Sequence, residues 1–185
     1  MLTNFDKVCA ELEKQELEAP IGIANPSTYA QLLAIYLFQN DVCNAKFLWK
    51  RIPQNITGSN PEIAAVWAVG QKLWKKDLPG TYQALAAFNW TEPVATIIRA
   101  LEERVRERTF ALIGRSYSNI SLSTVVTMTG LTREAVVQVC RDRKWVINED
   151  GLTIDPTPPV QPAPLHTSSE DQLFKLTEFV SFLEN

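Results

Sequence analysis

The residues that could carry catalysis or hold a metal ion are few in this chain of 185 residues. There is one histidine, His166, and there are three cysteines, Cys9, Cys43 and Cys140. A zinc metalloprotease needs two histidines and a carboxylate around its metal, and cysteine-based zinc sites show short, repeated spacings. The three cysteines are far apart and form no CxxC pair. We therefore expect reduced, mostly buried thiols and no metal site.

Nucleophilic catalysis and phosphate binding find no better support in the sequence. Ser118, Ser121 and Ser123 lie close together, but no base accompanies them, so turn and capping roles are expected. His166 lies in a proline-rich stretch, which supplies neither a positioned partner nor a preorganised pocket. The motifs GxxxxGKS/T and GxGxxG are absent. We predict a protein that is not an enzyme, with no cofactor and no small-molecule ligand.

Composition and charge argue against a polyanion-binding, secreted or membrane-spanning protein. The net charge of −3 favours no polyanionic partner. The first residues lack the apolar core of a signal peptide, and no apolar run approaches the roughly 20 residues needed to span a bilayer. We expect a soluble protein of the cytoplasm and nucleus that has no membrane partner.

Two Asn-Pro pairs organise the first half of the chain. Asn25 can cap a helix whose first residue is Pro26, and Asn60 with Pro61 repeats this pattern. The distance between the two pairs is close to the period of a tetratricopeptide-like helical hairpin. We predict that residues 1–90 form a helical-repeat region in which such hairpins stack.

A long helix is expected to begin near Thr91, with Thr91 as its cap. Its apolar residues fall on one stripe, which runs from Val94 through Leu101 and Val105 to Leu112. The charged residues between them lie mostly off the stripe. The pattern predicts a helix with one buried face and one solvated face.

A shorter helix, ended by Gly130, and another helix over residues 131–144 follow the long one. Two short strands, Trp145–Asn148 and Leu152–Ile154, are expected to pair as a hairpin around an Asp-Gly turn. Helix, turn, helix and hairpin in this order are typical of a winged helix, which we assign to residues 91–155.

The charges of this predicted winged helix do not suit DNA. The outer face of the last helix carries Arg133, Arg141 and Lys144, but also Glu134 and Asp142, so the charges largely offset one another. The turn of the hairpin reads Asn-Glu-Asp-Gly and would repel phosphate. We therefore predict that the winged helix contacts protein and not nucleic acid. A nucleic-acid-binding winged helix remains the alternative of a different class.

The composition changes after the hairpin. Residues 156–168 are rich in proline and predict an extended linker. Residues 169–185 predict a closing helix, with Ser169 and Gln172 as a capping box. Its apolar residues follow alternating steps of three and four along a seam formed by Leu173, Leu176, Val180 and Leu183 and widened by Phe179.

Two interpretations of the closing helix stay open. A single helix of this length is marginal in water, so its seam must be covered by something. The helix either folds back on its own domain or enters a helical bundle with other chains. Phe174 and Phe182 lie outside the seam, which favours several neighbours and hence the bundle.

Several longer strings resemble a known family. The fold, mainly α with a tetratricopeptide-like bundle, a winged helix and a trailing bundle helix, is that of the PCI subunits of the proteasome lid, the COP-nine signalosome and a translation initiation factor. The strings QELEAPIGIANPSTYAQLLAIYLFQNDVCNAKFLWKRIP, VGQKLWKKDLPGTYQAL, RTFALIGRSYS and LTEFVSFLEN are similar to the family of signalosome subunit eight. The resemblance covers nearly the whole chain.

The resemblance implies a non-catalytic scaffold in an eight-subunit complex that removes the modifier Nedd from cullins and so regulates cullin-RING ubiquitin ligases. The isopeptidase of that complex is another subunit. PCI subunits join through winged-helix edges into an open ring, and their closing helices share a bundle, so we expect contact with subunit three. Ile147 and Ile154 are the candidate edge residues. A proteasome-lid or initiation-factor scaffold subunit is the alternative within the same class.

Overall fold

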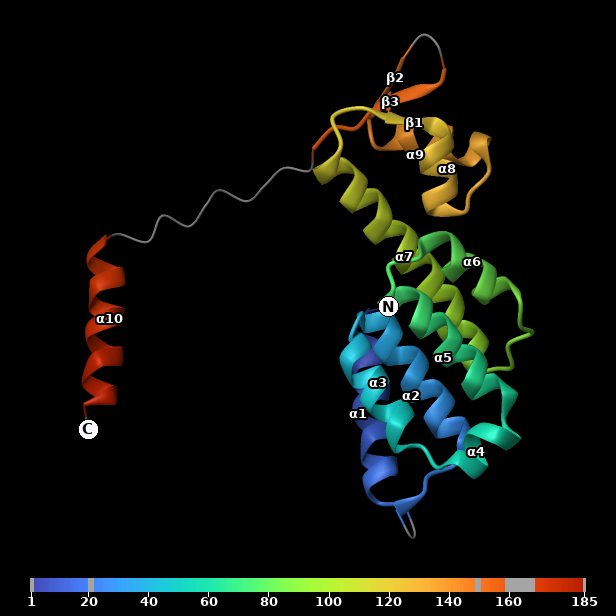
Figure 1. Cartoon of the computed structure of the whole chain (residues 1–185), viewed down its shortest axis with the longest axis vertical. Helices are drawn as coiled ribbons and strands as arrows, with labels where there is room; N and C mark the ends of the chain where they lie inside the picture. Colours follow the sequence, from blue (N-terminus) through green and yellow to red (C-terminus); the bar gives the residue numbers. More distant parts are fainter. Residues whose placement is uncertain (1, 20–21, 149–150, 159–168, 185) are drawn as a thin grey trace.

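The chain is mainly helical (Figure 1). The computed structural model describes residues 2–19, 22–148, 151–158 and 169–184. The elements are α1 (Leu2–Leu17), α2 (Pro26–Gln39), α3 (Val42–Arg51), α4 (Gln54–Ser59), α5 (Pro61–Trp74), α6 (Leu78–Ala86), α7 (Val94–Ser116), β1 (Ile120–Ser121), α8 (Leu122–Thr129), α9 (Arg133–Asp142), β2 (Val146–Ile147), β3 (Thr153–Asp155) and α10 (Ser169–Leu183).

The first predicted helix start is confirmed. The side chain of Asn25 accepts a hydrogen bond from the backbone N–H of Ser27 at 3.1 Å, and Pro26 is the first helical residue. The cap satisfies a backbone donor that has no partner inside the helix. Asn40 ends α2 in a left-handed conformation with φ of 66°, which asparagine tolerates better than most residues.

The second Asn-Pro start differs from the expectation. Asn60 does precede α5, but its side chain makes no cap; it donates to the carbonyl of Ile56 at 3.0 Å. The reason is the short helix α4, which ends directly before Asn60 and which the sequence pattern did not predict. The asparagine closes α4 instead of opening α5.

Helix α2 is the centre of the helical body. It packs against α1, α3, α5 and α7, and Leu32, Leu33 and Leu37 are fully buried. A helix that is apolar on all sides is stable only when neighbours surround it. The first hydrophobic core therefore forms around α2, and the other helices bring their apolar faces to it.

Helix α7 does not start where the sequence predicted. It begins at Val94, and Thr91 is not its cap. The backbone N–H and the hydroxyl of Thr91 both donate to the carboxylate of Glu62 on α5, at 2.9 and 2.8 Å. The threonine thus ties the loop before α7 to the preceding hairpin, a role that depends on a residue distant in sequence.

Two hydrophobic cores share α7. Leu101 and Val105 belong to the core around α2. Phe110 and Ile113, about two turns further on, belong to a second core with α8, α9 and the sheet. One helix therefore links the helical body to the C-terminal unit.

The C-terminal unit contains a three-stranded antiparallel sheet with the order β1-β3-β2. The predicted hairpin pairs as expected, with Ile147 opposite Ile154. The strand β1 was not predicted; its Ile120 pairs with the other side of Ile154. The order of elements is the one expected for a winged helix, while Glu149 and Asp150 of the predicted turn lie outside the described residues.

Gly130 ends α8 as predicted, with φ of 65°. A β-carbon at this position would lie 2.9 Å from the ring of Tyr82 on α6. The glycine thus supplies both the left-handed backbone and the room for α6 to approach the turn between α8 and α9. This contact is a second connection between the two parts of the chain.

Removing side-chain volume from α7 should destabilise the fold. We expect Leu101→Ala, at a fully buried site, to lower the free energy of unfolding by about 2–5 kcal/mol, because it leaves a cavity against α2. Leu17 is 86% exposed, and Leu17→Ala should cost less than about 0.5 kcal/mol. Urea denaturation followed by circular dichroism measures both, and equal effects would contradict the assigned core.

Candidate functional site

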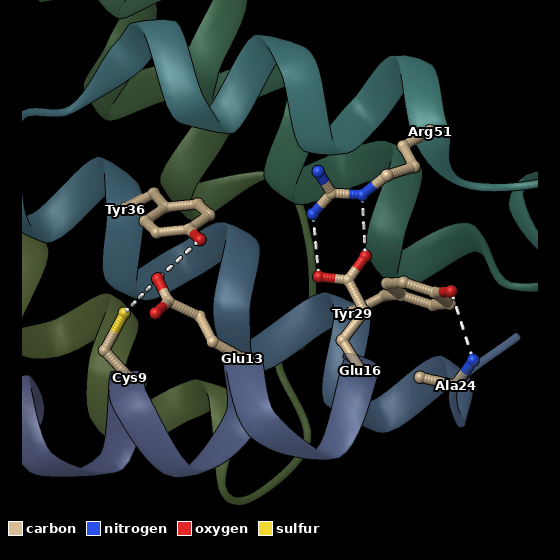
Figure 2. A network of polar contacts seen from close by, with 7 residues as sticks. All are labelled: Cys9, Glu13, Glu16, Ala24, Tyr29, Tyr36 and Arg51. Carbon is tan, nitrogen blue, oxygen red and sulfur yellow. Dashed lines mark hydrogen bonds and ion pairs between the residues drawn. The ribbon is translucent and has the colours of Figure 1, made fainter. Parts of the chain in front are cut away.

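A network of polar side chains lies between α1, α2 and α3 (Figure 2). The carboxylate of Glu13 accepts a hydrogen bond from the hydroxyl of Tyr36 at 2.8 Å and from the thiol of Cys9 at 3.6 Å. Next to it, the guanidinium of Arg51 donates two hydrogen bonds to the carboxylate of Glu16, at 2.8 and 2.7 Å. The network joins the first helix to the second and third.

The network is built for stability and not for nucleophilic chemistry. Burial, followed by the neighbouring charge of Glu13, raises the pKa of Cys9 to about 12. Burial and the hydrogen bond to Glu13 also raise the pKa of Tyr36. Both groups therefore stay neutral near pH 7, and a buried neutral thiol is a poor nucleophile.

The remaining candidates for chemistry have structural roles or lie outside the described residues. Ser121 caps α8 by accepting a hydrogen bond from the N–H of Thr124 at 3.2 Å, and its hydroxyl lies 3.0 Å from that of Ser123. His166 is outside the described residues. Within the described ranges, no three His, Cys, Asp or Glu side chains are grouped so that they could hold a metal ion. None of the helices described is long and apolar enough to cross a membrane.

The outer strands of the sheet are β1 and β2, and β3 lies between them. Ile147 lies on the outer strand β2 and is partly buried. Ile154 lies on the central strand β3, is paired on both sides, and is completely buried. The expectation that Ile154 belongs to an exposed edge is therefore wrong, because β1 covers the side of β3 that the sequence pattern left free.

A hollow of about 410 Å³ lies beside this edge, between α9 and the hairpin. Val137, Trp145 and Ile147 give it an apolar lining, and Arg133 and Arg141 flank it. The guanidinium of Arg133 donates to the carbonyl of Gly151 at 2.8 Å. Arg133, which the sequence placed among the cations on the outer face of this helix, therefore holds the hairpin against α9.

The closing helix α10 leaves its apolar seam uncovered. The exposed fractions along the seam are 63% for Leu173, 59% for Leu176, 66% for Phe179, 51% for Val180 and 80% for Leu183. The helix exists as predicted, but the Ser169 side chain of the expected capping box lies outside the described residues. The apolar side chains of the seam therefore remain exposed on this helix.

One exposed residue was assigned to the wrong face by the sequence pattern. Leu112 continues the stripe of Leu101 and Val105, but it is 51% exposed, and Phe110 and Ile113 are buried in its place. The buried face of α7 turns because its neighbours change from the helical body to the C-terminal unit. The phenylalanine and isoleucine flanking Leu112 are the signal that could have indicated this turn.

Comparison with known proteins gives consistent matches along the chain. A model of the CSN8/PSMD8/EIF3K family matches residues 23–164. COP9 signalosome complex subunit 8 of Danio rerio is 43% identical over 186 residues, covering 100% of this chain and 97% of the relative. Its namesake in Xenopus laevis is 40% identical over 183 residues, covering 98% and 93%. The Drosophila melanogaster protein of the same name is 32% identical over 185 residues, covering 100% and 99%.

The three thiols should differ sharply in reactivity. Cys43 is exposed, while Cys9 and Cys140 are buried, and burial also raises the pKa of Cys140. We expect the folded protein to react quickly with Ellman's reagent at about one thiol per chain, and Cys43→Ser to abolish this fast phase. All three thiols should react after denaturation. A fast phase that survives in Cys43→Ser would contradict the burial of Cys9 and Cys140.

Proposed function

The chain belongs to the CSN8/PSMD8/EIF3K family, and from this premise we propose that it is subunit eight of a COP9 signalosome and acts there as a non-catalytic scaffold. The observation that carries the proposal is the similarity to signalosome relatives over the full chain, at 43% and 32% identity for the fish and insect proteins. By this proposal the subunit supports removal of Nedd from cullins, and so regulates cullin-RING ubiquitin ligases, without performing the cleavage. It acts in the cytoplasm and the nucleus.

The sheet edge is the first surface that supports a scaffold. The backbone N–H of Asn148 donates to the carbonyl of Thr153 at 3.1 Å, which fixes the hydrogen-bonding register of β2 and β3. Because antiparallel pairs alternate, the neighbouring residue Ile147 directs its N–H and C=O away from β3. These outward-pointing backbone groups can extend the sheet with a strand from the adjacent subunit, which we take to be subunit three.

The closing helix is the second such surface. Isolated helices of about 15 residues are marginal in water, so α10 gains its stability from helices of other subunits. Burying one leucine side chain contributes about 1.5–3 kcal/mol. The seam from Leu173 to Leu183 can therefore supply several kcal/mol when it enters a common bundle.

Purification of the tagged full-length chain from cells tests the proposal. The expected result is co-elution with the other signalosome subunits, and cleavage of a neddylated cullin by the complex but not by the purified chain alone. Co-elution with proteasome-lid or initiation-factor subunits would assign the chain to another branch of its family. Zinc-dependent cleavage by the pure chain would contradict the scaffold role.

The tail should matter for assembly and not for folding. We expect the double change Leu176→Asp and Val180→Asp to release the chain from the complex, because it places two charges on the seam. The melting temperature of the free chain should change by less than about 2 °C, because both side chains are more than half exposed.

A matched control for the tail is available on its polar side. Lys175→Asp changes the net charge by the same −2 but lies off the seam, and it should be retained in the complex. A large fall in the melting temperature of the double variant would show that α10 packs on its own chain. Retention of the double variant would show that the seam is no interface.

The sheet edge can be tested without breaking the hairpin. Ile147→Pro removes an N–H that points away from β3, so it should weaken assembly with the adjacent subunit while the β2–β3 bonds remain. Ile147→Val keeps the N–H and should assemble normally. Circular dichroism of the free variants checks the fold, and normal assembly of a folded Ile147→Pro variant would exclude this edge as an interface.

A further inference from the structure

A hollow of about 430 Å³ lies where α7 passes from the helical body to the C-terminal unit. Its apolar lining comes from four elements or their ends, with Leu73, Leu78, Val105 and Met128 as the main contributors. Leu112 stands at its margin and is 51% exposed. We call this hollow the α7 groove.

The α7 groove is bordered by positive charge. Lys76 and Arg108 line it directly. Arg104, Arg108, Leu112 and Arg115 follow one another along α7 in steps of four, four and three, so they share one side of the helix. Two cations therefore line an apolar hollow, although the net charge of the chain is −3.

These cations are not neutralised by the nearby carboxylates. Glu102 pairs with Arg106, and Glu107 pairs with Arg143 at 3.2 Å. Among the residues that the structure describes, no ion pair involves Lys76, Arg104 or Arg108.

Arg108 is the cation in the least favourable surroundings. Its guanidinium donates to the carbonyl of Phe38 at 2.5 Å. Burial, and next the charge of Arg104, lower the pKa of Arg108. An apolar occupant without charge would remove Arg108 further from water and leave it without a counter-ion, which is unfavourable.

We propose that the α7 groove is a docking site for an acidic amphipathic helix of a partner protein. An apolar side chain of that helix fills the hollow beside Leu112, and its carboxylates pair with Arg108 and Lys76. This charge-complementary arrangement buries the apolar lining and neutralises both cations at once. It is a third interface, distinct from the sheet edge and the tail.

The closing helix of the chain itself is not the occupant in this structure. Helix α10 is acidic and apolar, but Phe179 and Phe182 are 66% and 80% exposed. None of its residues lines the α7 groove. The proposed occupant is therefore another protein of the complex, and in this respect the inference rests on the proposed function.

Photo-crosslinking in the assembled complex tests the site. The tagged full-length chain is expressed in cells with the photoreactive residue benzoylphenylalanine at position 112, irradiated, purified, and analysed by mass spectrometry. The expected crosslink joins position 112 to a partner segment with Asp or Glu at helical spacing around an apolar residue. The same photoreactive residue in place of Leu17, which is 86% exposed at the end of α1, should give no comparable crosslink.

Charge reversal makes the test specific. Lys76→Glu and Arg108→Glu should each reduce the crosslink at least fivefold, while Arg99→Glu, at an exposed position on the same helix, should not. Lys76→Glu keeps the test valid if Arg108→Glu disturbs the fold, which the melting temperature reveals. Reversing the partner carboxylate to arginine should restore crosslinking to the Lys76→Glu chain.

The outcomes separate this inference from the proposed function. Crosslinking to α10, to a segment without acidic residues, or at no more than the Leu17 level would overturn the docking site. The proteins that co-purify report independently on the proposed function. An acidic crosslinked helix from a complex other than the signalosome would support the groove and contradict the assignment to the signalosome.

Discussion

The packing of one helix in two hydrophobic cores is the constraint on which the rest of the structure depends. Helix α7 is 23 residues long, or roughly 35 Å, and it presents Leu101 to the helical body and Ile113 to the C-terminal unit. The approach of Tyr82 to Gly130 connects the two parts a second time. The sheet edge and the α7 groove are therefore held in fixed positions relative to the helical body.

Polar side chains inside the helical body are paired with one another, whereas two surfaces on the outside are exposed. Inside, Glu13 and Glu16 are matched by a hydroxyl, a thiol and a guanidinium, which hold α1 against α2 and α3. On the outside, the edge of β2 and the seam of α10 have no cover among the residues described. Burial and contact with Glu13 raise the pKa values of Cys9 and Tyr36 within this network.

The sequence predicts this structure well where the deciding interactions are local. The cap at Asn25, the turn at Gly130 and the seam of α10 each depend on residues within a few positions, and all three were expected. The expectations fail where contacts with residues distant in the sequence determine the position of a side chain. Thr91 bonds to Glu62 across 29 positions, Ile154 is buried because β1 pairs with it, and Leu112 turns outward because α7 changes neighbours. None of these partners can be read from a helical or strand period alone.

We propose that the free chain is a folded body whose closing helix becomes stable only in a complex. Hydrogen–deuterium exchange of the free chain and of the assembled complex tests this most directly, because it measures the opening of each helix separately. We expect strong protection of α2 and of the first half of α7 in both samples. We expect almost no protection of α10 in the free chain and strong protection of α10 in the complex. Protection of α10 that is already strong in the free chain, or that stays weak in the complex, would contradict this proposal.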